Sequence, residues 1–183
     1  MEADRPEGLV LVSGPSRGGK SRWAEHLISA CAEVTYIATS PAMPDDSSWQ
    51  QRLKLHRERR PSHWHLVECD GQLLDAVSKA PEHHALLIDA LGGFTAAYLE
   101  KDSDQWNMLG TYLLGILNQR QQPVVMVIEE TGWGVVPPTA IGGLFRDRQG
   151  RFAQRLAFHA NRSWLVVQGR ALDLHALGQA VPL

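Results

Sequence analysis

The chain has 183 residues, of which 44% are hydrophobic and 21% charged, so a substantial core can form and disorder of the whole chain is excluded. Its 18 lysines and arginines nearly balance its 20 aspartates and glutamates, which argues against binding nucleic acid or an anionic membrane by bulk charge. No apolar run approaches the roughly 18 residues of a membrane-spanning helix, residues 1–8 do not resemble a signal peptide, and two cysteines are too few for a disulfide framework. We therefore expect one cytoplasmic domain over residues 1–183, with residues 1–8 disordered and residues 170–183 forming a tail.

Short apolar runs alternate with longer segments of helical periodicity along the chain. Strands are predicted at residues 9–13, 34–38, 64–68, 85–89, 123–129 and 164–168. Helices are predicted at residues 20–32, 47–59, 104–121 and 144–161, with a Gly/Pro-rich loop at 132–143. This alternation is typical of an α/β fold in which a mostly parallel sheet carries helices on both faces.

A glycine-rich motif follows the first strand and opens the first helix. Residues 14–21 read Gly-Pro-Ser-Arg-Gly-Gly-Lys-Ser and fit the phosphate-loop pattern G-x-x-x-x-G-K-[ST] without a mismatch. The glycines let backbone N–H groups converge on phosphate oxygens, and the helix that begins at Lys20 points its positive dipole end at them. We expect Lys20 to reach the β- and γ-phosphates and the Ser21 hydroxyl to bind Mg²⁺. The motif predicts a nucleoside triphosphate site formed by Gly14, Pro15, Ser16, Arg17, Gly18, Gly19, Lys20 and Ser21.

Acidic residues end two of the predicted strands. Asp89 closes the apolar run at 85–89, and a carboxylate at the end of a strand beside a phosphate loop can hold Mg²⁺ or its water shell. We therefore predict that Asp89 contacts the nucleotide and its metal ion. Glu129 and Glu130 close the strand at 123–129, at the same edge of the sheet. The sequence leaves two interpretations open: one of them polarises a water or a substrate hydroxyl, or both are solvated strand-end carboxylates.

A basic segment at residues 52–61 places five cations and one histidine within ten residues. On composition alone this segment is a solvated basic helix. Four of the five cations are arginines, however, and planar guanidinium groups suit bidentate contacts with phosphate better than lysine does. Neutral histidine is nucleophilic near pH 7, and a phosphoramidate on it divides one difficult transfer into two easier ones. The alternative to the solvated helix is therefore that His56 accepts a phosphoryl or nucleotidyl group.

Together these motifs resemble the bifunctional adenosylcobinamide kinase / adenosylcobinamide-phosphate guanylyltransferase family, and the resemblance runs from Leu9 to about Gly169. The residues that carry it are Gly14 to Ser21, Tyr36-Ile37-Ala38-Thr39-Ser40, Arg52-Leu53, His56-Arg57, Arg59-Arg60-Pro61, Trp64, Leu87-Ile88-Asp89, Glu130-Thr131-Gly132-Trp133-Gly134-Val135-Val136-Pro137 and Phe145-Arg146-Asp147.

The resemblance implies a RecA-like P-loop fold, a single nucleotide-binding domain and a homotrimer. It also implies two successive reactions. First, ATP or GTP phosphorylates the aminopropanol hydroxyl of adenosylcobinamide, and GTP then transfers GMP through a guanylylated histidine to adenosylcobinamide phosphate. By position that histidine is His56, and Lys20 takes part in catalysis. The implied nucleotide contacts outside the phosphate loop are Ala38, Thr39, Ser40, Arg57, Glu58, Arg59, Arg60, Glu68 and Asp89, and the implied Mg²⁺ ligands are Ser21 and Asp89. A carboxylate such as Glu68 accepts hydrogen bonds from guanine N1–H and its amino group, which favours GTP.

The chain departs from the family pattern at three places. The family usually shows Thr-x-Trp-x-x-Asn after the strand-end acid, whereas this chain has Gly92-Gly93-Phe94-Thr95-Ala96-Ala97. Before Gln154, this chain has Ala153 where the family has asparagine. Before Phe145, it has Gly143 where the family has arginine. We expect nucleotide binding to persist, and the differences to concern corrinoid contacts, the kinase reaction or subunit packing. Two other functions stay open: a small-molecule P-loop kinase without guanylyl transfer, in which His56 is structural, and a non-catalytic GTP-dependent regulatory module.

Overall fold

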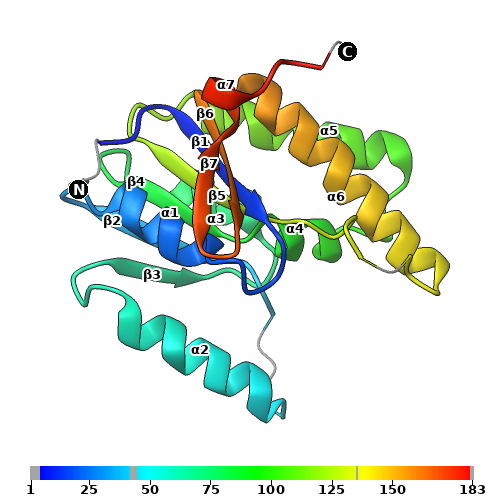
Figure 1. The fold of residues 1–183 in the computed structure, drawn as a ribbon, viewed down its shortest axis with the longest axis horizontal. Helices are drawn as coiled ribbons and strands as arrows, with labels where there is room; N and C mark the ends of the chain where they lie inside the picture. Colours follow the sequence, from blue (N-terminus) through cyan, green and yellow to red (C-terminus); the bar gives the residue numbers. More distant parts are fainter. Residues whose placement is uncertain (1–4, 42–44, 135, 182–183) are drawn as a thin grey trace.

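Figure 1 shows the chain as a computed structural model that describes residues 5–41, 45–134 and 136–181. For residues 48, 49, 52, 55 and 56 only the backbone is described. The strands in these ranges are β1 (Leu9–Gly14), β2 (Val34–Ala38), β3 (His65–Glu68), β4 (Ala85–Asp89), β5 (Val124–Glu129), β6 (Arg162–Val167) and β7 (Arg170–Asp173). The helices are α1 (Lys20–Ile28), α2 (Ser47–Arg59), α3 (Leu73–Lys79), α4 (Leu91–Ala97), α5 (Ser103–Asn118), α6 (Ala140–His159) and α7 (Leu174–Leu177).

The strands form one sheet in the order β3-β2-β4-β5-β1-β6-β7. Neighbouring strands are parallel except for β6 and β7, which are antiparallel. Parallel neighbours need a crossover connection, and the intervening helices supply it. β5 lies between β1 and β4, so one strand separates the strand that enters the phosphate loop from the strand that ends in Asp89. This is the RecA-like order, and the predicted α/β fold class is confirmed.

Helices cover both faces of the sheet, as the side chains of β1 illustrate. Leu9 and Leu11 pack into a core shared with α3, α4, α5 and α6, whereas Val10 and Val12 pack into the core under α1. Alternate residues of a strand point to opposite faces, so a strand covered on both sides reads as a continuous apolar run. In Figure 1, α2 lies at the β3 end of the sheet. The carboxyl ends of the parallel strands meet at one edge, where open α/β sheets bind their ligands.

Most predicted elements lie where the sequence places them, with small differences at their ends. The predictions at 34–38, 47–59 and 85–89 match β2, α2 and β4 residue for residue. The helix predicted at 20–32 ends at Ile28, whose carbonyl accepts a hydrogen bond from the Cys31 amide. The helix predicted at 144–161 begins earlier, at Ala140, because the Thr139 side chain accepts a hydrogen bond from the Gly142 amide and caps it. The Gly/Pro-rich loop is correspondingly shorter than predicted.

The sequence patterns did not indicate α3, α4 or any structure after Gly169. Residues 170–177, predicted only as part of a tail, form β7 and α7, and the Asp173 side chain caps α7 by accepting from the His175 and Ala176 amides. At the other end, the Val124 amide donates to the Gly8 carbonyl, while residues 1–4 of the expected disordered segment lie outside the described residues. In the described part of the chain, no helix combines the length and the apolar character needed to cross a bilayer.

Candidate functional site

The phosphate loop connects β1 to α1 at the carboxyl edge of the sheet. The Pro15 carbonyl accepts hydrogen bonds from the Gly18 amide (3.2 Å) and from the Lys20 ammonium group (2.8 Å). Lys20 is only 8% exposed, whereas Ser16 and Arg17 are exposed at the tip of the loop. The predicted phosphate-binding residues therefore form one tight turn at the start of α1, where the helix dipole favours an anion.

Two glycines of the loop are required by its contact with β6. A Cβ atom at Gly14 would lie 2.1 Å from the Val166 carbonyl oxygen, and one at Gly18 would lie 2.7 Å from the same atom. Gly14 also has a φ of +146°, a backbone conformation that other residues rarely adopt. The loop can therefore lie against β6 only because these positions carry no side chain.

Asp89, the predicted metal-binding carboxylate, is oriented by Tyr36 of the neighbouring strand. The Tyr36 hydroxyl donates a 2.6 Å hydrogen bond to Asp89 Oδ2. Burial, reinforced by the charge of Asp89, raises the pKa of Tyr36 well above its usual 10, so the hydroxyl keeps its proton and remains a donor. The Arg60 guanidinium lies 4.3 Å from the centre of the Tyr36 ring, a cation–π contact. Asp89 is therefore held in a defined orientation at the end of β4.

Thr39 joins the chain segments that follow β2 and β4. Its buried hydroxyl donates to the Ala90 carbonyl and accepts a 3.0 Å hydrogen bond from the Ala90 amide, while its own amide donates to the Asp89 carbonyl at 3.2 Å. Ala38, just before it, is in register with Asp89 on one side and Glu68 on the other. In this structure the Thr39 side chain therefore holds the edge of the sheet together.

Glu129 ends β5 directly opposite Gly14, the first residue of the phosphate loop. Its Oε2 accepts hydrogen bonds from the Gly92 amide (2.9 Å) and from Gln149 Nε2 (3.3 Å). Gln149 is buried, and its own oxygen accepts a hydrogen bond from the Thr95 hydroxyl. Burial raises the pKa of Glu129 and the nearby charge of Asp89 adds to the rise, against the opposing effects of the hydrogen bonds and of Lys20.

Helix α2 is attached to the sheet by arginine ion pairs. Arg59 donates from Nε and Nη2 to the two carboxylate oxygens of Glu25 in α1, at 2.6 Å and 2.8 Å. Arg57 donates to Glu68 at the end of β3, at 2.9 Å. Bidentate pairs of the first kind combine strength with a defined geometry. These contacts fix the last turn of α2 against α1 and β3.

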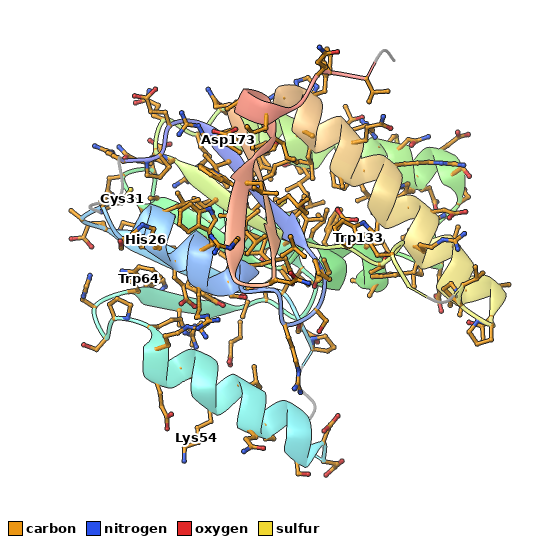
Figure 2. The ribbon with its side chains drawn as sticks, in the orientation of Figure 1. His26, Cys31, Lys54, Trp64, Trp133 and Asp173 are labelled. Carbon is orange, nitrogen blue, oxygen red and sulfur yellow. The ribbon has the colours of Figure 1, made fainter. Side chains whose placement is uncertain are left out.

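The structure therefore gathers some of the predicted site residues and leaves others apart. The phosphate loop, Ala38, Thr39 and Asp89 share the carboxyl edge of the sheet. Glu58 pairs with Lys54 at 3.8 Å, and Figure 2 shows Lys54 pointing away from the sheet. His56 belongs to α2, but its side chain lies outside the described part of the structure.

Comparison with known proteins identifies the family. The sequence model of the cobinamide kinase / cobinamide phosphate guanyltransferase family matches residues 10–174. The chain belongs to this family.

Relatives of this kinase and guanyltransferase family cover nearly the whole chain. The bifunctional adenosylcobalamin biosynthesis protein CobU of Salmonella typhimurium is 36% identical over an alignment of 182 residues. The match covers 88% of this chain and 96% of that protein. CobU of Escherichia coli is 35% identical over 177 residues, with 88% and 96% covered. CobP of Pseudomonas aeruginosa is 33% identical over 167 residues, with 90% and 95% covered. A solved structure from Pyrococcus horikoshii OT3 (project PH0250) has a TM-score of 0.50 at 6% identity, over 92% of this chain and 85% of that chain, and shows a likeness of fold alone.

Two of the residues that depart from the family pattern, Gly92 and Ala153, lie close to Glu129 or line the same cavity. A Cβ atom at Gly92 would lie 2.9 Å from both carboxylate oxygens of Glu129, so glycine lets this carboxylate approach the start of α4. Ala153 lines a cavity that Glu129 also lines. Sequence reasoning did not identify Tyr36 or Gln149 as site residues, because one lies in an apolar strand and the other on a regular helix. Pairing of β2 with β4 brings Tyr36 to Asp89, and packing of α6 on the sheet brings Gln149 to Glu129.

Proposed function

We propose that the chain catalyses the two reactions of its family: a nucleoside triphosphate phosphorylates cobinamide, and GTP then supplies GMP to the cobinamide phosphate, as in cobalamin biosynthesis. The observation that carries this proposal is the family match over residues 10–174 in a chain whose phosphate loop is complete. All three relatives above are named as adenosylcobalamin biosynthesis proteins, which supports adenosylcobinamide and its phosphate as the substrates. The enzyme acts as a cytoplasmic homotrimer in this proposal.

In the phosphorylation step the phosphate loop holds the triphosphate while the substrate hydroxyl attacks. The hydroxyl oxygen forms a bond to the γ-phosphorus as the bond to the bridging oxygen breaks, and the nucleoside diphosphate leaves with that electron pair. Amide groups of residues 14–21 and the Lys20 ammonium group stabilise the charge on the phosphate oxygens. Lys20 is suited to this because it is buried and already directed into the loop by its bond to Pro15.

The oxygen atoms at this edge fit a magnesium ion, which prefers hard oxygen ligands. Ser21 and Asp89 would hold it, from the first turn of α1 and the end of β4. When bound, the ion neutralises charge on the β- and γ-phosphate oxygens. The hydrogen bond from Tyr36 occupies Asp89 Oδ2 and so orients the carboxylate.

In the guanylyl transfer step His56 is the nucleophile. Its ring nitrogen forms a bond to the α-phosphorus of GTP, and pyrophosphate leaves. An oxygen of cobinamide phosphate then attacks the same phosphorus and breaks the N–P bond, which returns a free histidine. The implied contacts to this nucleotide are Ala38, Thr39, Ser40, Arg57, Glu58, Arg59, Arg60, Glu68 and Asp89. Recognition of guanine by Glu68 would free Arg57, its present partner, for a phosphate.

Incubation of the full chain with GTP labelled at the α-phosphate tests this proposal. We expect an acid-labile, base-stable label on the protein, and release of that label when cobinamide phosphate is added. His56→Ala should abolish the label while nucleotide binding stays within about twofold, and His63→Ala is the matched control that retains it. A His56→Ala chain that is still labelled would reject His56 as the nucleophile. A wild-type chain that phosphorylates cobinamide but never becomes labelled would favour the kinase without guanylyl transfer.

A further inference from the structure

A cavity of about 300 Å³ lies beside Glu129, on the face of the sheet that α6 covers. Its walls come from β1, the end of β5 and the residues that follow it, the start of β6 and one side of α6. They include Ser13, Glu129, Arg146, Gln149, Gln154 and Ser163. A small set of polar groups in a largely apolar wall is typical of a site that orients a small ligand. Its volume suits a short arm of a substrate better than a macrocycle.

One of the polar groups that line this cavity is a hydroxyl without a hydrogen-bond partner in the described structure. Ser163 is 6% exposed, and its Oγ makes no hydrogen bond. A buried hydroxyl without a partner is unfavourable by roughly 1–3 kcal/mol, so a molecule in the cavity, a water included, gains a hydrogen bond by contacting Ser163 Oγ. Ser163 lies on β6 in register with Leu11 of β1, which places it below the edge where Glu129 sits.

The phosphate loop and this cavity lie on opposite sides of one short stretch of the sheet edge. Lys20 extends from α1, which covers one face, whereas Gln149 and Ser163 line the cavity under α6 on the other face. Glu129 stands between them, opposite Gly14 in the strand register. A ligand in the cavity would therefore reach the nucleotide by passing Glu129.

Hydrogen bonds hold the Glu129 carboxylate in one orientation at this edge of the sheet. The hydrogen bonds that the carboxylate accepts from the Gly92 amide and from Gln149 Nε2 both fall on Oε2. A Cβ atom at Gly92 would lie 2.9 Å from both oxygens, so the carboxylate fits here only beside glycine, and the Thr95 hydroxyl donates to the side-chain oxygen of Gln149 in turn. A solvated strand-end carboxylate, the simpler interpretation that the sequence left open, needs no such support.

We propose that the cavity under α6 binds the aminopropanol arm of cobinamide, and that Glu129 accepts the proton of its hydroxyl as the oxygen attacks the γ-phosphorus. This inference rests on the proposed function. It identifies the residues that bind and deprotonate the phosphoryl acceptor in the first reaction. The new O–P bond forms at the γ-phosphorus, the bond to the nucleoside diphosphate breaks, and the hydroxyl proton moves to the Glu129 carboxylate. Burial raises the pKa of that carboxyl, which brings it closer to the pH at which a base is most effective.

The test compares the two reactions in Glu129→Gln, a variant that keeps the shape of the side chain. We expect kcat for phosphorylation of cobinamide to fall about a hundredfold or more, with KM for the nucleotide unchanged. GMP transfer to ready-made cobinamide phosphate should stay within about twofold, because that step has no hydroxyl to deprotonate. The wild-type rate of phosphorylation should rise with pH through the raised pKa of Glu129, and this rise should vanish in the variant. A merely structural role would lower both reactions together and keep the pH profile.

A second variant tests the cavity. Ala153→Phe fills it from α6 and should raise KM for cobinamide about tenfold or more without changing KM for the nucleotide, whereas Arg151→Phe on the exposed side of the same helix should not. Wild-type rates of phosphorylation in Glu129→Gln, or their loss in Glu130→Gln instead, would overturn the role of Glu129. A wild-type chain without either reaction would overturn the proposed function, and this inference with it.

Discussion

Tyr36 donates a 2.6 Å hydrogen bond to Asp89 across the β2–β4 pair, and it does so from a position where it stays protonated. Asp89 was predicted from the sequence as a metal-binding carboxylate, but the residue that orients it was not. We expect Tyr36→Phe to lower the free energy of unfolding by about 1–3 kcal/mol, because the half-buried Asp89 carboxylate loses a donor. Urea unfolding at neutral pH measures this loss, and Tyr112→Phe, at an exposed tyrosine, is the control.

The same hydrogen bond predicts a dependence on alkaline pH. Because the folded pKa of Tyr36 is raised above its usual 10, chiefly by burial, the folded chain retains a proton that the unfolded chain releases. The stability that Tyr36 contributes is therefore complete below about pH 10 and is lost as the pH rises further. The Phe variant should lose less stability over that window than the wild type. Parallel slopes for the two chains would contradict the assignment.

The third prediction concerns Lys20, on the phosphate side of the site. Lys20→Ala removes a buried positive charge from the turn that Pro15 and Gly18 close, so transition-state stabilisation should fall by about 3 kcal/mol, which corresponds to roughly a hundredfold in rate. Initial rates of phosphoryl transfer at saturating cobinamide give this ratio. Lys79→Ala, at an exposed lysine that pairs with Asp75, should leave the rate unchanged. Normal turnover without Lys20 would refute the phosphate-loop assignment.

The features that sequence could predict are those set by neighbours along the chain. The phosphate loop is one continuous motif, and β4 is one continuous apolar run, so both were found with the correct fold class. α4 was missed because its second and third residues, in the sequence Leu91-Gly92-Gly93-Phe94-Thr95-Ala96-Ala97, are glycines, which are poor helix formers. The chain that follows α4 is held by Arg148 of α6, whose guanidinium donates to the carbonyls of Tyr98, Leu99 and Lys101. A stabilising contact about fifty residues away leaves no periodic signal.

The Glu25–Arg59 pair predicts how firmly α2 is attached to α1. The Glu25 side chain is 11% exposed and that of Arg59 is 34% exposed, so part of the pair is shielded from solvent. Arg59→Ala should lower the free energy of unfolding by about 1–3 kcal/mol, because it leaves Glu25 buried without its bidentate partner. A double-mutant cycle with Glu25→Gln should give a coupling energy of about 1 kcal/mol or more. Additive effects of the two substitutions would show that the pair does not hold α2.

The raised pKa of Glu129 predicts how the free energy of unfolding changes with pH, without any substrate. Its folded pKa is raised from 4.5, mainly by burial, so the folded chain keeps this proton to a higher pH than the unfolded chain does. The stability that this group contributes is present below pH 4.5 and is lost as the pH rises through the folded pKa. Glu129→Gln cannot ionise, so its stability relative to the wild type should be greater at pH 8 than at pH 4. Urea midpoints at the two pH values measure this difference, with the exposed Glu100→Gln as a control for the loss of one charge. A Glu129→Gln difference that stays constant with pH would mean that the stabilisation of the carboxylate by Gly92 and Lys20 cancels the cost of burial. The pKa of Glu129 would then not be raised, which contradicts this assignment.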